Sequence, residues 1–253
     1  MLINKEKKMK FALAAKGFIN GDLNHNSGVI LKTLEDYRGR ADMVLFGEAF
    51  LQGFYGPTFE LDHDLKMALA LDHPVFDEIA GKARESSIAV SFGFIEREGE
   101  TIYSSQATIN AQGEIVDVFR RVSPGWKIEG AGESYREGEG FHSFLLEGRK
   151  MAVGLCGDLW FDENIRQIKD LQLDLLLWPV YTDFPFKEWN SSIKYDYAAQ
   201  ANRACSMTLL VNSFCLDKRN EEEIAKGGAA FFLQGKIGKD LPAAEEGVFL
   251  VEI

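Results

Sequence analysis

Three apolar runs in this sequence end at side chains that can take part in covalent chemistry. "MVLFGEAF" leads to Glu48, "IVDVFRRV" to Arg120 and Arg121, and "MAVGLC" to Cys156. Short apolar runs of this kind are typical of buried β-strands, and α/β proteins place active sites in the loops at the carboxyl ends of strands. A carboxylate, a cation and a thiol in one cleft would suit attack of sulfur on a carbonyl carbon, with the carboxylate as base.

The residues after Cys156 fit the same chemistry. The backbone N–H groups of Gly157 and Asp158 could face an oxyanion. A helical pattern follows, and the amino-terminal end of a helix lowers the pKa of a nearby thiol. A cysteine after an apolar strand is also a common core residue, so both interpretations stay open at this point. Cys205 and Cys215 lie in or beside apolar runs without a nearby acid or base, and we predict that they belong to the core.

Other kinds of site have little support. The four histidines do not occupy strand ends comparable to that of Glu48, which argues against a Cys–His pair. The cysteines and histidines lack metal-ligand spacing, and no glycine-rich loop leads into a helix. We therefore expect neither a metal nor a cofactor.

Composition limits the classes of partner. The chain has 28 Lys and Arg against 39 Asp and Glu, a net charge of −11, which disfavours nucleic acids and anionic membrane surfaces. Three cysteines do not make a disulfide framework, so a reducing cytoplasm is the expected location. A faint signal-peptide pattern at the start is interrupted by Lys16, and no apolar run is long enough to cross a membrane.

The pattern of elements predicts an α/β protein. With 253 residues, 46% of them hydrophobic, we expect a single domain over residues 1–253, with residues 1–9 as a loose tail. Strand-length apolar runs alternate with helical patterns and then follow one another directly. Some runs are apolar throughout and others alternate, which predicts packed sheets with helices outside. The helical patterns cover residues 25–41, 73–86, 161–172 and 189–206.

Five segments, in this order, resemble the carbon–nitrogen hydrolase (nitrilase-type amidase) superfamily. They are "VLFGEAFLQGF", "VFRRVSPGWKIEGAGESYREGEGF", "AVGLCGDLWFDE", "LLLWPVY" and "GGAAFFLQGKIGKDLPAAEEGVFLVEI", and they run from about residue 10 to the last residue. The resemblance implies a four-layer α-β-β-α sandwich, a homodimer and a catalytic Glu–Lys–Cys set, often with a second glutamate. Carried over, the first glutamate is Glu48, the nucleophile is Cys156 and the second glutamate is Glu129.

The chain departs from the family pattern at the lysine. The aromatic–Arg–Lys triplet is replaced by Phe119, Arg120 and Arg121. Arginine keeps the positive charge but is longer and planar, and it does not donate a proton near neutral pH. Either Arg121 supplies the charge alone, or Lys127 supplies it. In an extended segment Lys127 would point to the same side as Glu129, two positions later. It could equally be a surface lysine.

The resemblance implies cleavage of a small, non-peptide amide through a thioester on Cys156. Trp160 and Tyr181 follow strand ends, so we expect them to line the substrate pocket beside Gly157 and Asp158. Two alternatives remain open. The missing lysine suits a catalytically impaired relative that binds a metabolite or a protein, and the same thioester could serve an acyl transferase.

Overall fold

Two six-stranded β-sheets form the centre of the molecule. The computed structural model describes residues 8–217 and 224–253. The first sheet has the order β14 (Gly247–Glu252), β1 (Lys10–Ala15), β3 (Met43–Phe46), β4 (Ala89–Glu98), β5 (Thr101–Ile109), β6 (Ile115–Arg120). The second sheet has the order β13 (Lys236–Leu241), β12 (Ala229–Leu233), β10 (Met207–Asn212), β9 (Leu175–Val180), β8 (Arg149–Val153), β7 (Phe144–Leu146). A two-stranded ribbon joins β2 (Gly17–Phe18) and β11 (Phe214–Cys215).

The parallel strands lie in the middle of each sheet and are covered on both faces. In the first sheet β1, β3 and β4 are parallel, and in the second sheet β8, β9 and β10 are parallel. Every residue of β3 and of β9 is buried. This explains their continuous apolar sequences, "MVLF" and "LLLWPV", because a strand buried on both faces has no solvent side for polar residues.

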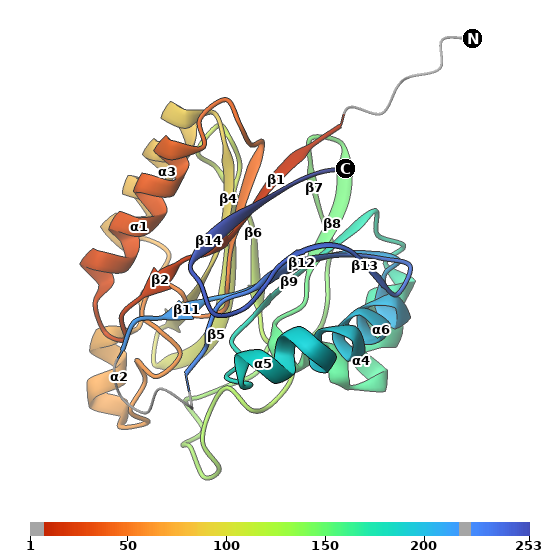
Figure 1. The fold of residues 1–253 in the computed structure, drawn as a ribbon. Helices are drawn as coiled ribbons and strands as arrows, with labels where there is room; N and C mark the ends of the chain where they lie inside the picture. The colour runs from red at the N-terminus through yellow and green to blue at the C-terminus, as the bar shows by residue number, and fades with distance from the viewer. Residues whose placement is uncertain (1–7, 218–223) are drawn as a thin grey trace.

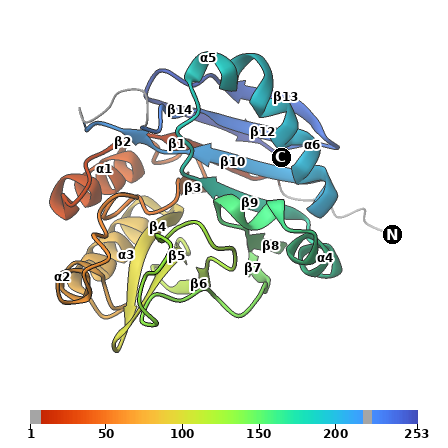
Figure 2. The same ribbon diagram turned by 90° about the horizontal axis from the view of Figure 1, so that it is seen from below.

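Helices cover the outer faces of the two sheets (Figures 1 and 2). The first sheet carries α1 (Leu23–Asp36) and α3 (Pro74–Ser86), with the short α2 (Leu61–Met67) at one end; the second carries α4 (Asp162–Asp170) and α6 (Lys194–Ala204), with the short α5 (Phe186–Glu188). A 3₁₀ turn, η1 (Cys156–Trp160), precedes α4, and a π turn, η2 (Trp189–Ile193), precedes α6.

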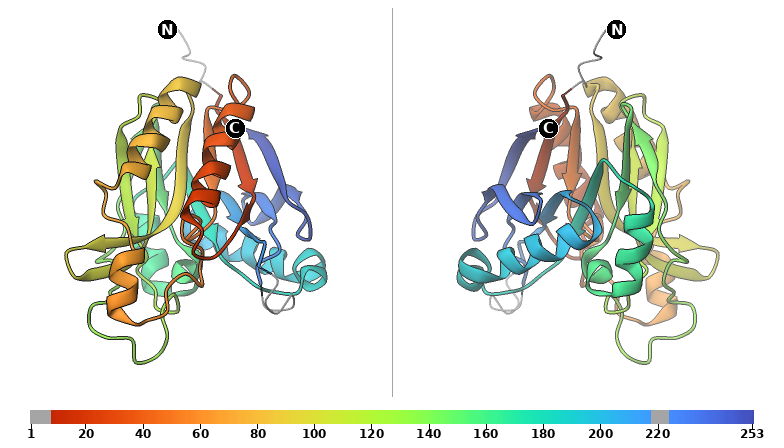
Figure 3. Two further views of the ribbon diagram at one scale, coloured as in Figure 1. Left: turned by 90° about the vertical axis from the view of Figure 1, so that its left-hand side faces the viewer. Right: turned by 90° about the vertical axis from the view of Figure 1, so that its right-hand side faces the viewer.

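Alternating side chains on the strands fill three apolar layers. On β1, Phe11 and Leu13 point between the two sheets, whereas Ala12 and Ala14 point toward α1 and α3. A third layer packs the second sheet against α4 and α6. The result is the predicted four-layer α-β-β-α sandwich, whose sheets are seen edge-on in Figure 1 and face-on behind their covering helices in Figure 3.

The structure corrects the prediction of a loose tail over residues 1–9 at Met9. Residues 1–7 of the predicted loose tail lie outside the described residues. Met9 is buried, however, and exchanges two backbone hydrogen bonds with Ile253. Met9 is therefore not part of a loose tail, because it already extends the pairing of β1 with β14. Within the described part of the chain, no helix is both long and apolar enough to cross a membrane.

Candidate active site

Glu48 lies two residues after the end of β3 and is fully buried. Its turn packs closely on β4, where a Cβ atom on Gly93 would lie 2.2 Å from the nitrogen of Ala49, so only glycine allows this approach. Oε1 of Glu48 accepts hydrogen bonds from Arg121 and, at 3.3 Å, from Ser104. Oε2 is buried and accepts no hydrogen bond from a side chain or backbone group within residues 8–217 and 224–253. One carboxylate oxygen is thus held in place by Arg121 and Ser104, while the other is not.

Arg121 is the cation next to Glu48. It is 4% exposed, and its Nη1 lies 2.8 Å from Oε1 of Glu48. Burial opposes its charge, but the negative charge of Glu48 favours it, and the pKa of Arg121 is raised overall. Arg120 points the other way, to Glu96 and Glu98, because successive residues of a strand face opposite sides. Because of this alternation, Arg120 lies in a structural ion pair and Arg121 lies beside Glu48.

Cys156 follows the second sheet's β8 and has an unusual backbone. Its φ of 41° is in the left-handed region, which is strained for a residue with a Cβ atom. Its carbonyl oxygen accepts a hydrogen bond of 2.9 Å from Nε1 of Trp178, and its thiol donates to the carbonyl oxygen of Tyr181 at 3.4 Å. Cys156 is partly exposed as a residue, and its thiol lies close enough to the charged groups of Glu48 and Arg121 for both to act on its pKa.

The thiol of Cys156 is not activated by a helix, contrary to the expectation from the sequence. Burial and, second, the negative charge of Glu48 raise its pKa to about 12, although Arg121 acts in the opposite direction. The element that starts at Cys156 is a single 3₁₀ turn, which provides little of the dipole that a longer helix would. The thiol is therefore protonated near neutral pH, and its reaction needs a base.

Asp158 has a different role from the predicted one. Its side chain is fully buried and accepts hydrogen bonds from the backbone N–H groups of Val122, Ser123 and Leu155. Its own N–H donates to the carbonyl of Leu155, so it does not face an oxyanion. Desolvation raises the pKa of Asp158 to about 6. The carboxylate instead joins the chain after β6 to the chain before Cys156.

Lys127 and Glu129 lie in a loop that bends rather than extends. The ammonium group of Lys127 bonds the carbonyl of Tyr135 at 2.6 Å and the carboxylate of Glu137 at 2.9 Å, and Glu129 is exposed. Side chains two residues apart share a side only in an extended chain, so the spacing of Lys127 and Glu129 does not place them together here. The structure pairs Glu48 with Arg121 and engages Lys127 elsewhere.

Aromatic side chains surround Cys156 on the side of the second sheet. Tyr197 of α6 is buried, and the charge of Cys156 contributes to raising its pKa, after burial. Its ring contacts Trp160, which is 45% exposed, and the ring of Phe184, which is 40% exposed. Tyr181 is buried and stacks on Phe54, so its backbone rather than its ring meets the thiol. Sequence reasoning missed Tyr197, although its place on the apolar side of the predicted helix was a usable signal.

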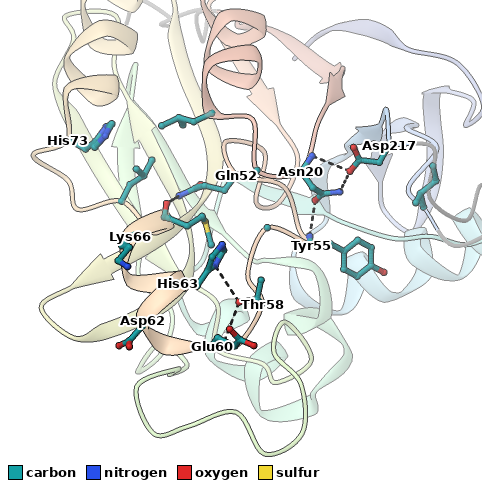
Figure 4. A pocket seen from close by; sticks show the side chains of 16 residues that line it. Asn20, Gln52, Tyr55, Thr58, Glu60, Asp62, His63, Lys66, His73 and Asp217 are labelled. Atoms are coloured by element: carbon teal, nitrogen blue, oxygen red, sulfur yellow. Dashed lines mark hydrogen bonds between the residues drawn. The ribbon is translucent and has the colours of Figure 1, made fainter.

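A surface cavity of about 1210 Å³ lies beside α2 (Figure 4), and Tyr55, one of its lining residues, contacts the ring of Tyr181. Polar side chains line much of it, including Asn20, Thr58, His63 and Asp217. None of the nine predicted site residues lines this cavity. No group of three or more His, Cys, Asp or Glu side chains within residues 8–217 and 224–253 is arranged to hold a metal ion.

The sandwich and the Glu–Arg–Cys cluster define a protein of the nitrilase type, and comparison with known proteins agrees. Residues 13–253 match the Carbon-nitrogen hydrolase family, and the chain belongs to this family. A bromoxynil-specific nitrilase of Klebsiella pneumoniae subsp. ozaenae is 30% identical over 84% of this chain and 67% of its own length. An N-carbamoylputrescine amidase of Arabidopsis thaliana is 26% identical over 55% of this chain and 47% of its own length.

The chain therefore spans about half to two thirds of the length of these two curated relatives. A glutamine-dependent NAD(+) synthetase of Aquifex aeolicus is 24% identical, over 63% of this chain but 27% of that longer protein. Among solved structures, an amidase from Nesterenkonia sp. has a TM-score of 0.79 at 19% identity, covering 100% of this chain and 93% of that one. This likeness confirms the α/β sandwich fold.

Proposed function

We propose that this chain is a thiol amidohydrolase that cleaves the C–N bond of a small amide through a thioester on Cys156. The observation that carries the proposal is the meeting of three groups from separate strands of two sheets. Arg121 lies 2.8 Å from Glu48, and both charges act on the pKa of the Cys156 thiol. A base, a cation and a nucleophile in one buried cluster are the parts that acyl transfer requires.

In the first half of the proposed cycle, Oε2 of Glu48 takes the thiol proton as the sulfur attacks the carbonyl carbon. The carbon–oxygen π pair moves onto oxygen, and the tetrahedral oxyanion is stabilised by Arg121 and the backbone N–H of Gly157. Glu48 then donates its proton to the leaving nitrogen as the C–N bond breaks. Concerted proton removal fits a thiol whose pKa is raised to about 12, because a free thiolate would be scarce near neutral pH.

In the second half, a water molecule gives a proton to Glu48 and attacks the thioester carbon. The C–S bond breaks and the sulfur regains a proton from Glu48, which restores the starting state. Arg121 stabilises charge in both tetrahedral intermediates but transfers no proton, since a guanidinium stays charged at neutral pH. Each donor to the oxyanion is worth about 3–4 kcal/mol in the transition state.

The aromatic side chains favour an apolar acyl group on the substrate. Trp160 and Phe184 are each partly exposed and contact Tyr197, so an apolar wall runs from the surface toward the sulfur. Small amides are the natural first probes, because variants of the Nesterenkonia sp. AN1 amidase are described in complex with acrylamide and with butyramide. The proposal also includes a homodimer and a cytoplasmic location, which are predictions from the family resemblance and the cysteine count.

A function limited to binding is the second candidate, and the arginine is the observation that favours it. Arg121 is tied to the carboxylate that must act as base, and it does not return a proton as an ammonium can. The substrate would then occupy the site without turnover.

Release of ammonia from acetamide, acrylamide and butyramide distinguishes these functions, with the Cys156→Ala variant as control. The proposed hydrolase releases ammonia from at least one amide, and the variant releases none. Release that is unchanged in the variant would overturn the mechanism. Saturable binding without release would favour the second candidate, and ammonia release that begins only when an amine acceptor is added would favour the transferase.

A further inference from the structure

Each of the three guanidinium nitrogens of Arg121 donates a hydrogen bond to a neighbouring group. Besides Nη1 on Glu48, Nε donates to Oγ of Ser123 at 3.0 Å and Nη2 donates to the carbonyl of Pro124 at 3.1 Å. A lysine has neither a second nitrogen nor an Nε donor, so it could not make all three contacts at once. The surroundings of Arg121 are therefore built for a planar, forked cation.

Gly157 leaves the space that this cation occupies. A Cβ atom on Gly157 would lie 2.7 Å from Nη2 of Arg121 and 3.0 Å from Oγ of Ser123. The far end of an arginine usually moves aside at little cost, but here three hydrogen bonds fix it in a buried site. The backbone of Gly157 is not in the left-handed region, so this side-chain contact is what an alanine there would change.

Ser123 connects this cation to the chain that carries the nucleophile. Its hydroxyl accepts from Arg121, and its backbone N–H donates to Oδ1 of Asp158 at 2.7 Å. Oδ2 of Asp158 accepts from the N–H of Leu155, the residue before Cys156. The guanidinium is thus fixed relative to the sulfur through one serine and one buried carboxylate.

We propose that Ser123 and Gly157 are positioning residues that adapt this active site to an arginine at position 121. The catalytic meaning of this inference rests on the proposed function. The arginine-binding arrangement of Ser123 and Gly157 is itself a property of the folded protein. It follows that a larger side chain at position 157 should be harmful only when residue 121 is an arginine. The hydroxyl of Ser123 should likewise be needed only with an arginine at that position.

The test is a double-mutant cycle with a readout that does not depend on turnover. The rate at which iodoacetamide alkylates Cys156 near neutral pH is measured by mass spectrometry for the wild type, G157A, R121K and R121K/G157A. Arg121 lowers the pKa of this thiol, so a displaced guanidinium should slow alkylation. We expect G157A to slow it about tenfold in the arginine background and less than about twofold in the lysine background, a coupling of about 1.0–1.4 kcal/mol.

S123A and R121K/S123A repeat the cycle and keep the proposal testable if G157A does not fold. We expect the loss of the hydroxyl to slow alkylation with Arg121 present and to have no effect with lysine. G132A is the matched control, since a Cβ atom on Gly132 meets nothing within 4 Å, and its rate should equal the wild-type rate. Equal effects in both backgrounds would overturn the proposal. Coupling of residue 121 to residues 123 and 157, without ammonia release from any amide, would support the positioning role and reject the proposed function.

Discussion

The indole N–H of Trp178 donates a hydrogen bond of 2.9 Å to the carbonyl oxygen of Cys156. Cys156 has a φ of 41°, so this bond holds a strained peptide in the orientation that the proposed nucleophile needs. Trp178 is fully buried on β9 and reaches across to the end of β8, the neighbouring parallel strand. Trp178 of β9 and Tyr181 just after it thus both bond Cys156, the first at its backbone and the second at its thiol.

Replacing Trp178 by phenylalanine should lower kcat and leave KM nearly unchanged. The variant keeps most of the apolar packing but loses the donor, and we expect a loss of about tenfold, the equivalent of one hydrogen bond of roughly 1.4 kcal/mol. Steady-state kinetics on the best amide checks this. Trp126→Phe is the matched control, because Trp126 is buried and its Nε1 has no hydrogen-bond partner within the described residues. Equal losses in the two variants would show a packing effect and contradict this role.

Replacing Glu48 by glutamine distinguishes a base from a charge that merely disfavours the thiolate. If Glu48 removes the thiol proton during attack, Glu48→Gln should slow alkylation of Cys156 by iodoacetamide. If its charge acts only by raising the thiol pKa, the same change should speed alkylation, since that contribution is lost. Mass spectrometry of the alkylated peptides gives the rates, with the buried Cys205 and Cys215 as internal references. Faster alkylation in the variant would remove Glu48 as the base.

Stability should depend on pH through His142, which joins the edges of the two sheets. Nε2 of His142 lies 2.7 Å from Oδ1 of Asp117 on β6, and this hydrogen bond raises the pKa of His142 above its usual 6.5. The stabilisation is fully present below the unfolded pKa, about 6.5, and is lost as the pH rises through the higher folded value. His142 is half-exposed, although Asp117 is buried, so solvent screening keeps the contribution of the pair below about 1 kcal/mol.

Urea unfolding of the wild type and of His142→Gln, at several pH values on both sides of neutrality, measures this contribution. The wild type should lose more unfolding free energy than the variant as the pH rises. Parallel curves for the two proteins would mean that the ion pair does not stabilise the fold.

The sequence predicted the layers well, because buried strands and amphipathic helices have clear apolar patterns. It missed α2, whose seven residues "LDHDLKM" are too short and polar for a helical period to be recognised. It also missed β13, an edge strand in which Lys236, Lys239 and Asp240 interrupt the alternation. The first helix begins at Leu23 behind the capping carboxylate of Asp22, two residues before the predicted helical pattern over residues 25–41.

The site was predictable where a strand end fixes direction and unpredictable where a loop does. Glu48 and Cys156 each follow a buried parallel strand, so their meeting could be inferred from topology. The choice between Arg121 and Lys127 depended on bends after residue 122, for which the sequence contains no periodic signal. The raised pKa of Cys156 depends on its buried surroundings, including residues distant in sequence, which no local motif reveals.

The most direct test of the central account is capture of the acyl group on the sulfur of Cys156. The enzyme is mixed with butyramide, quenched in acid during turnover and digested, and the peptide that contains Cys156 is examined by mass spectrometry. The account predicts a butyryl adduct on this peptide that hydroxylamine removes, with none on the peptides of Cys205 and Cys215. Steady ammonia release with Cys156 free of acyl group at every quench time, and undiminished release by Cys156→Ala, would contradict it.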